Sequence, residues 1–229
     1  MYAPQPLLPV ISEQYALSAA HASWLMSSVT LGVAVGVLPL GAASARRGRG
    51  RMIVAGLALA FCGMAVHSGV YNAAAFRGAA APLFMNPAMI SLLFLAYGAG
   101  TLTSSLVGRV VARVPARSIH VVALACSAGG LAVSLIPQLW SFVLGLVMLS
   151  AGFFAVHALA NPTAARLSAQ PSAGAARYNL AYYVGASVGA VIFATAWDAG
   201  GWGAVVVLAC GFLDVAAVLA WIWAPREVG

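Results

Sequence analysis

Charged residues are scarce in this chain of 229 residues. Only 7% of the residues are charged, lysine is absent, and all 11 basic residues are therefore arginine, against 4 acidic residues. Soluble domains carry about 25% charged residues, which they need to present a surface that water solvates. Because 63% of this sequence is hydrophobic and its mean hydropathy is +0.98, a water-soluble globular protein is excluded.

Cysteine is scarce as well. Cys62, Cys126 and Cys210 each lie inside an apolar run, and no two of them have the spacing of metal ligands. An odd number of scattered cysteines predicts neither a disulfide framework nor a zinc site. The sequence also lacks a phosphate-binding loop and a complete dinucleotide-binding glycine motif. We therefore expect no metal and no other cofactor.

Long apolar segments are what the sequence has in abundance. A membrane-spanning helix needs about 20 mainly apolar residues, because lipid cannot pair with backbone polar groups. Only the last such segment contains a formal charge, Asp214. The sequence therefore predicts an all-α, polytopic membrane helix bundle of about seven transmembrane helices. The expected spans are Ala22–Leu40, Met52–Tyr71, Met89–Val107, Ser118–Ile136, Ser141–Ala160, Leu180–Trp197 and Trp202–Trp221.

The arginines lie between these spans. Threading the chain back and forth puts Arg77 alone on one side and the rest of the 11 arginines on the other. Short loops rich in arginine stay in the cytoplasm, so we expect the N-terminus outside and the C-terminus inside. Topology thus accounts for the net charge of +7, and lipid rather than nucleic acid is the expected partner.

Two connections on the arginine-rich side share the pattern Gly-x-x-x-Ala-Arg. One runs from Gly41 to Arg46 and the other from Gly108 to Arg113. Such an internal echo is typical of the duplicated bundles from which secondary transporters are built.

The first of these connections resembles the cytoplasmic loop of the major facilitator superfamily, which reads Gly-x-x-x-Asp-Arg-x-Gly-Arg-x-Arg. The resemblance implies a loop that gates the cytoplasmic side. Ala45 and Ala112 stand where the family pattern has Asp, which implies a weakened latch on that side. The matching residues are Gly41, Arg46, Gly48, Arg49 and Arg51.

Other stretches resemble one subgroup of that family, the proton-driven exporters of the bacterial inner membrane. The resemblance implies a secondary active transporter of small molecules, located in that membrane, in which protons drive export. The stretches are Tyr2–Pro9, Val70–Asn72, Gly152–His157, Tyr182–Gly189 and Gly201–Trp202, similar to the family's first, seventh, tenth and eleventh helices and the turn into its twelfth.

Family members have twelve helices, whereas here the resemblance passes from the third helix into the seventh between Met52 and Met64. We therefore expect a partial major-facilitator fold. Residues 1–51 would be a remnant of the N-terminal half, with one span and the basic loop, and residues 52–229 a six-helix bundle like the C-terminal half. Because the family's substrate path lies between the halves, such a chain would need to self-associate, or it would not transport. The alternative is a non-transporting remnant that only packs against partner helices.

His157 and Asp214 are the candidates for proton coupling. His157 lies inside the fifth span, matches the family's tenth helix, and is the residue type that titrates near physiological pH. Asp214 lies near the centre of the last span, where insertion costs about 2.5–3.5 kcal/mol, so we expect it to face protein or water and to have a partner. The structural alternatives are a neutral histidine bonded to a backbone carbonyl and a neutral acid bonded to a neighbouring helix.

Five further residues are candidates for the substrate pathway. His67, Tyr71 and Asn72 are close enough on one helix to line a polar cavity together, although Tyr71 and Asn72 could instead lie at the membrane interface. Tyr182 and Tyr183 begin the sixth span, either as a polar stripe facing a cavity or as an aromatic belt at the membrane boundary.

Pairs of glycines one turn apart, Gly32 with Gly36 and Gly185 with Gly189, predict close helix packing. Ser187 formally completes a Gly-x-Ser-x-Gly motif. A hydrolase elbow needs a strand before the serine and a histidine after it, and neither is present. We therefore expect no enzyme activity.

Overall fold

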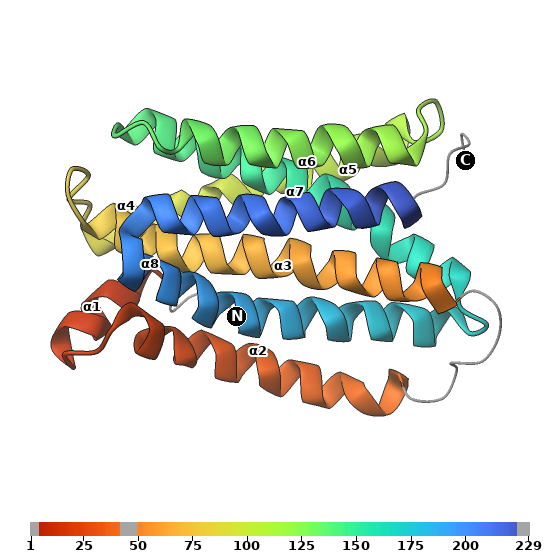
Figure 1. Ribbon diagram of the computed structural model, residues 1–229, viewed down its shortest axis with the longest axis horizontal. Coiled ribbons are helices and arrows are strands. Elements are labelled where there is room, and N and C mark those ends of the chain that lie inside the picture. Colours follow the sequence, from red (N-terminus) through yellow and green to blue (C-terminus); the bar gives the residue numbers. More distant parts are fainter. Residues whose placement is uncertain (1–4, 42–49, 224–229) are drawn as a thin grey trace.

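A computed structural model of the chain describes the backbone of residues 5–41 and 50–223, and the side chains of residues 5–28, 30–31 and 54–221. Throughout this part the regular elements are helices, packed as one bundle, which confirms the all-α class (Figure 1). In chain order they are η1 Gln5–Leu7, α1 Leu8–Gln14, α2 Ala19–Gly41, α3 Gly50–Ala79, α4 Pro87–Leu92, η2 Leu93–Ala96, α5 Tyr97–Val110, α6 Ala116–Val133, α7 Leu139–Leu167 and α8 Pro171–Trp223.

Five helical segments of the described residues are long and apolar enough to cross a membrane, which is compatible with a multi-pass membrane protein. Each of four segments overlaps one predicted span, and the fifth, in α8, contains two. The first predicted span, Ala22–Leu40, coincides with α2, whose side chains after residue 31 lie outside the described part. The segments are Val54–Ala79, Pro87–Val110, Ala116–Val133, Leu139–Leu167 and Pro171–Trp221.

Helix α8 is a hairpin of two antiparallel arms (Figure 1). Its helical geometry breaks at Gly200 and at Gly201, where φ is +61°. A positive φ costs glycine little, because glycine has no Cβ to clash with the backbone. The structure therefore has its turn at Gly200 and Gly201, between the last two predicted spans.

Helix α3 lies at the centre of the bundle. In its most apolar stretch 72% of the residues are buried, against 28% for the stretch Pro87–Val110. The first arm of α8 packs closely on α3, because a Cβ built at Gly185 or Gly189 would collide with backbone atoms of Phe61 or Ala65. The predicted close approach at this glycine pair is confirmed, whereas Gly32 and Gly36 lie outside the described side chains.

Two predicted loops are shorter than the sequence indicated. Residues 72–79 continue α3. Helix α7 extends to Leu167 and α8 begins at Pro171, so the two helices cover most of the connection predicted at residues 161–177. Polar residues there do not end the helices because their side chains find partners. Asn72 pairs with Gln5, and Thr163 donates to the Leu159 carbonyl of its own helix at 2.7 Å.

Helix α2 packs against the first arm of α8 through a polar contact. The Ser27 hydroxyl donates to the Ser187 carbonyl at 2.7 Å, and the hydroxyls of Thr30 and Ser187 lie 2.5 Å apart. Ser187 therefore serves helix packing in this fold. The segment predicted as a separate remnant is joined to the rest of the bundle by these contacts.

One end of the bundle, here called the arginine end, holds the turns after α5 and α7 and the last residues of α8 (Figure 1). The turns after α3 and α6 and the break in α8 lie at the opposite end. At the arginine end the Arg117 guanidinium donates to the Trp221 carbonyl and lies 4.1 Å from the centroid of its ring. The described arginines at helix ends there are Arg109, Arg117 and Arg166, and Arg77 lies in the last turn of α3, at the opposite end.

At the opposite end, Asp198 fastens the α8 hairpin to the start of α2. Its two carboxylate oxygens accept from the backbone N–H groups of Ala19 and Ala20, at 3.1 and 3.0 Å. These N–H groups begin a helix and have no partner within it.

Replacing Asp198 by alanine is expected to lower the free energy of unfolding by about 1 kcal/mol, the usual cost of losing a helix cap. Unfolding of the purified protein in mixed micelles by added dodecyl sulfate, followed by circular dichroism, measures it. The variant Asp198→Asn keeps one acceptor oxygen and should lose less. Equal stability of the alanine variant and the parent would contradict the capping role.

Candidate functional site

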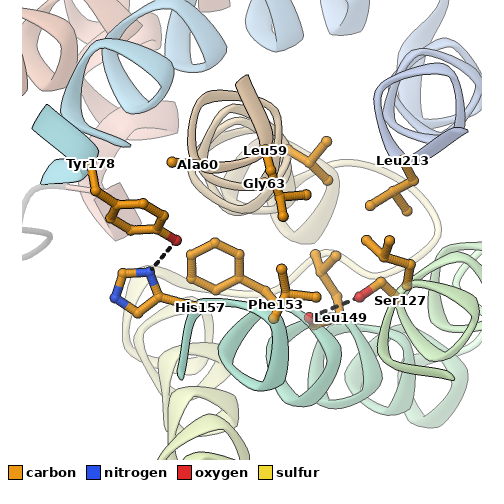
Figure 2. A pocket seen from close by; sticks show the side chains of 12 residues that line it. Leu59, Ala60, Gly63, Ser127, Leu149, Phe153, His157, Tyr178 and Leu213 are labelled. Carbon is orange, nitrogen blue, oxygen red and sulfur yellow. Dashed lines mark hydrogen bonds between the residues drawn. The ribbon is translucent and has the colours of Figure 1, made fainter. Parts of the chain in front are cut away.

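His157 lies inside the bundle, on the side of α7 that meets α3 and the first arm of α8 (Figure 2). Its Nδ1 atom is 3.1 Å from the hydroxyl of Tyr178, which is buried. Which of the two groups donates depends on the imidazole tautomer. The partner of His157 is thus a tyrosine side chain from another helix.

His67 on α3 lies in a box of aromatic rings and is only 1% exposed. Its ring is stacked on that of Phe153, with centroids 4.2 Å apart and planes 13° apart. Neither ring nitrogen has a hydrogen-bond partner among the described residues. Burying such nitrogens without a partner costs free energy, so a hydrogen bond to a described residue is not what stabilises His67 in this position. The other rings of the box are Tyr71, Tyr97 and Phe154, at centroid distances of 5.0, 5.0 and 5.5 Å.

Phe153 connects the two histidines. Besides stacking on His67, it stacks on His157, with centroids 5.9 Å apart and planes 19° apart. The ring of Tyr182 lies 5.0 Å from that of His157. His67, Phe153, His157, Tyr178 and Tyr182 are called the histidine row below, and they come from α3, α7 and α8. The phenyl ring offers neither a donor nor an acceptor, so a hydrogen-bonded proton path between the histidines is interrupted at Phe153.

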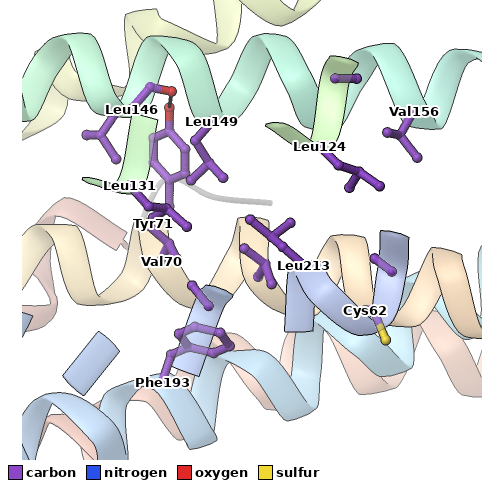
Figure 3. Close-up of a cluster of buried hydrophobic side chains, with 14 of the residues drawn as sticks. Cys62, Val70, Tyr71, Leu124, Leu131, Leu146, Leu149, Val156, Phe193 and Leu213 are labelled. Carbon is purple, nitrogen blue, oxygen red and sulfur yellow. Dashed lines mark hydrogen bonds between the residues drawn. The ribbon is translucent and has the colours of Figure 1, made fainter. Parts of the chain in front are cut away.

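Two polar pairs lie next to the histidine row, toward the opposite end. The hydroxyls of Tyr71 and Ser150 are 2.7 Å apart, and Tyr71 sits within the apolar core formed by α3, α6, α7 and α8 (Figure 3). At the next residue of α3, Asn72, the Oδ1 atom accepts a hydrogen bond from Gln5 Nε2 at 2.5 Å. The remaining polar atoms of these two amides, Gln5 Oε1 and Asn72 Nδ2, have no partner among the described residues. The Gln5–Asn72 hydrogen bond joins η1 to α3.

A small cavity adjoins His157 (Figure 2). Its volume is about 20 Å³, measured for the centre of a water-sized sphere, which is room for about one water molecule. A water there would have few polar partners, because most of the wall is apolar. The cavity beside His157 is therefore too small for any larger ligand. Lining residues include Gly63, Ser127, Phe153, His157, Tyr178 and Leu213.

The structure does not bring the two proton-coupling candidates together. His157 is half-buried among aromatic rings, whereas Asp214 is exposed on the outside of the second arm of α8. Asp214 was expected to face protein or water and to have a partner; among the described residues no hydrogen bond of its side chain is found, and its exposure leaves the choice between protein and water open. The sequence left the orientation of Asp214 open, because the apolar residues around it do not reveal which side of the helix faces the bundle.

Of the pathway candidates, His67, Tyr71 and Asn72 are fully buried, with exposures of 1%, 1% and 0%. Tyr71 and Asn72 therefore do not lie on the outer surface of the bundle. None of the three lines the cavity beside His157. Tyr182 contacts His157, and Tyr183 lies behind it, with ring centroids 5.2 Å apart, so only Tyr182 belongs to the histidine row.

The predicted gating loop falls largely outside the described part. Arg46, Gly48 and Arg49 lie outside the described residues. Gly41 is the last residue of α2 and Arg51 lies in the first turn of α3, but their side chains are also outside that part.

Four residues of this site, Tyr178 among them, were not among the candidates predicted from the sequence. Phe153 and Ser150 precede His157 by four and seven residues, so they share its face of α7, and that spacing could have identified them. Gln5 gave no such signal, because its partner Asn72 is 67 residues away. In the part that the structure describes, no three His, Cys, Asp or Glu side chains gather as metal ligands.

No protein-family model matches the chain, and no curated protein is significantly similar to it in sequence.

Proposed function

We propose that this protein is a secondary active transporter that moves a small molecule across the bacterial inner membrane in exchange for protons. The observation that carries the proposal is the pair of histidines, His67 and His157, inside helices apolar enough to cross a membrane. Ionisable residues within transmembrane bundles are costly and mark ion or substrate pathways. The likeness of the arginine-rich loop to that of the major facilitator superfamily supports the same function.

His157 and Tyr178 would carry the transferred proton, since both groups can donate and accept. In the closed conformation Phe153 interrupts the path to His67. Movement of α7 relative to α3 would displace the phenyl ring, admit water and connect the histidines. Separation of Gln5 from Asn72 would open the end of the core above them. The arginine end would face the cytoplasm, because short basic loops are retained there.

Flux measurements on the reconstituted full chain test the proposal. Vesicles containing a pH-sensitive dye would receive an imposed pH gradient and a panel of small cations, drugs and metabolites. For a compound that moves protons, His157→Gln is expected to reduce the flux on the order of 100-fold, as loss of a positioned proton-transfer group does. His21→Gln is the control, because His21 is exposed near the start of α2.

Unchanged proton flux in the His157→Gln variant would overturn the assigned role. One observation favours the second candidate, a non-transporting membrane protein that packs against partner helices. The cavity beside His157 holds only about one water, with a volume of about 20 Å³. Absence of proton movement with every compound of the panel would favour that function.

A further inference from the structure

A groove runs between α5 and α6 on the outside of the bundle. Both helices pack on α7 rather than on each other, which leaves the space between them open. The floor of the groove consists of small residues of α7, namely Ala151, Gly152 and Ala155. Its volume is about 340 Å³, measured as for the cavity beside His157, and pockets that bind small molecules have about 300–1,000 Å³. It is called the α5–α6 groove below.

The wall of the α5–α6 groove is mostly apolar and is reached from the outer side of the bundle. Val110 and Val122 line it and are 42% and 68% exposed, whereas Val107 is buried. On α6 the lining residues run from Ser118 to Cys126, about 12 Å along the helix. Half of the hydrocarbon core of a bilayer, the depth of one leaflet, is about 15 Å. The groove therefore fits one acyl chain of a lipid in the leaflet at the arginine end.

Positive charge borders the groove at the arginine end. Arg109 and Arg113 lie on either side of Val110 in the sequence, and both are exposed. The N–H groups of Arg113 and Val114 donate to the Val110 carbonyl, at 2.9 and 3.0 Å, so the chain makes one more helical turn there. Residues three or four apart share a side of a helix, which puts Arg113 on the groove side with Val110. Arg117 follows in the sequence and donates to α8 instead.

An anionic group is complementary to this end of the groove. Helices α5, α6 and α7 contain no acidic residue, so no carboxylate of the helices that form the groove repels an anion. Guanidinium groups bind phosphate through paired, charge-assisted hydrogen bonds. Basic pockets between transmembrane helices bind the headgroups of anionic lipids. An apolar groove one leaflet deep, with arginines at its mouth, therefore matches a phospholipid of net negative charge.

We propose that the α5–α6 groove binds an anionic phospholipid, with one acyl chain between the helices and the phosphate at Arg109 and Arg113. The proposal needs the arginine end to lie at a membrane surface. It is independent of transport and of the histidine row.

A second apolar groove provides an internal comparison. It has a volume of about 540 Å³ and lies toward the opposite end, where Met89 of α4 and Leu139 of α7 line it. Among the described residues Arg77 is the arginine at that end, and its guanidinium donates to the Ala81 carbonyl at 2.8 Å. A preference for anionic headgroups is therefore expected at the α5–α6 groove and to a smaller extent at the second groove.

Photo-crosslinking of the full chain in phosphatidylcholine vesicles tests the site. The probes are a phosphatidylglycerol and a phosphatidylcholine that carry the same diazirine group in one acyl chain, each added at increasing molar fraction. Mass spectrometry locates the adducts. Adducts on the residues that line the α5–α6 groove are expected to reach half of their maximum at a phosphatidylglycerol fraction about 30-fold lower than the phosphatidylcholine fraction. Two arginines at about 1 kcal/mol each supply this factor.

Arginine variants then measure the role of the headgroup contacts. Arg113→Gln is expected to raise the half-maximal phosphatidylglycerol fraction about 5-fold, and Arg109→Gln/Arg113→Gln should abolish the preference. Arg113→Lys keeps the charge and should retain most of the preference. Arg166→Gln is the matched control, because it removes one charge at the same end but from the last turn of α7. Helical circular dichroism equal to that of the parent shows that each variant is folded.

Equal half-maximal fractions for the two probes, or equal effects of Arg113→Gln and Arg166→Gln, would overturn the headgroup contacts. Adducts spread evenly over the outer faces of the helices would overturn the groove as the binding site. Displacement of the phosphatidylglycerol probe by glycerol phosphate, which has no acyl chain, would indicate a site for free phosphate in place of a lipid.

Discussion

Replacing Gly189 by valine is expected to lower the free energy of unfolding by about 3 kcal/mol, the upper end of the cost of overpacking a core. A Cβ at this position would come within 2.6 Å of the Ala65 Cα atom on α3. Because the obstacle is backbone, rotation of a side chain cannot relieve the collision. The two helices must move apart along the central contact of the bundle.

Dodecyl sulfate titration of the purified protein measures this loss, and Gly108→Val is the matched control. No heavy atom lies within 4 Å of a Cβ built at Gly108, so that variant should stay within about 0.5 kcal/mol of the parent. Similar stabilities of the two variants would show that α3 and α8 do not pack as closely as described.

Replacing His67 by phenylalanine is expected to raise the free energy of unfolding by about 1–3 kcal/mol, the cost of a buried polar group without a partner. Phenylalanine is also a flat ring and can keep the stacking on Phe153. The same variant should lose the proton-coupled flux that we propose, because it carries no titratable group. A gain in stability with a loss of flux is typical of residues kept for function.

The control for His67→Phe is Tyr71→Phe, which also removes a polar group from a buried aromatic ring. The Tyr71 hydroxyl does have a partner, Ser150, at 2.7 Å. Its loss should therefore lower the free energy of unfolding, by about 1 kcal/mol. A decrease in stability for His67→Phe, measured by the same titration, would mean that the imidazole has a hydrogen-bond partner.

Much of the fold could be predicted because it depends on local properties. Hydropathy located the spans, Gly200 and Gly201 marked the α8 turn, and Gly185 with Gly189 indicated a close approach of two helices. The ends of α3 and α7 were less predictable, since Asn72 and Asn161 suggested loops. Whether a polar residue ends a helix depends on whether a partner lies nearby, and Gln5 comes from a distant part of the chain.

The candidate site could be predicted only in part. His157 and His67 were identified because ionisable residues are rare within apolar spans. Their surroundings were not, since Tyr178 reaches His157 from the next helix and Phe153 joins the histidines through packing. The outward orientation of Asp214 was likewise not determined, since the sequence indicated only that it faces protein or water.

The sequence by itself determined that this is an all-α chain of long apolar helices, with all arginines but Arg77 in the connections predicted for one side. Those properties depend only on the hydropathy and charge of segments of about 20 neighbouring residues. Only the tertiary structure decided that His67 and His157 point inward while Asp214 points outward. Helices that are apolar on every side carry no pattern to mark the inner face. That face is chosen by contacts between segments far apart in sequence, such as Asp198 with Ala19 and Gln5 with Asn72.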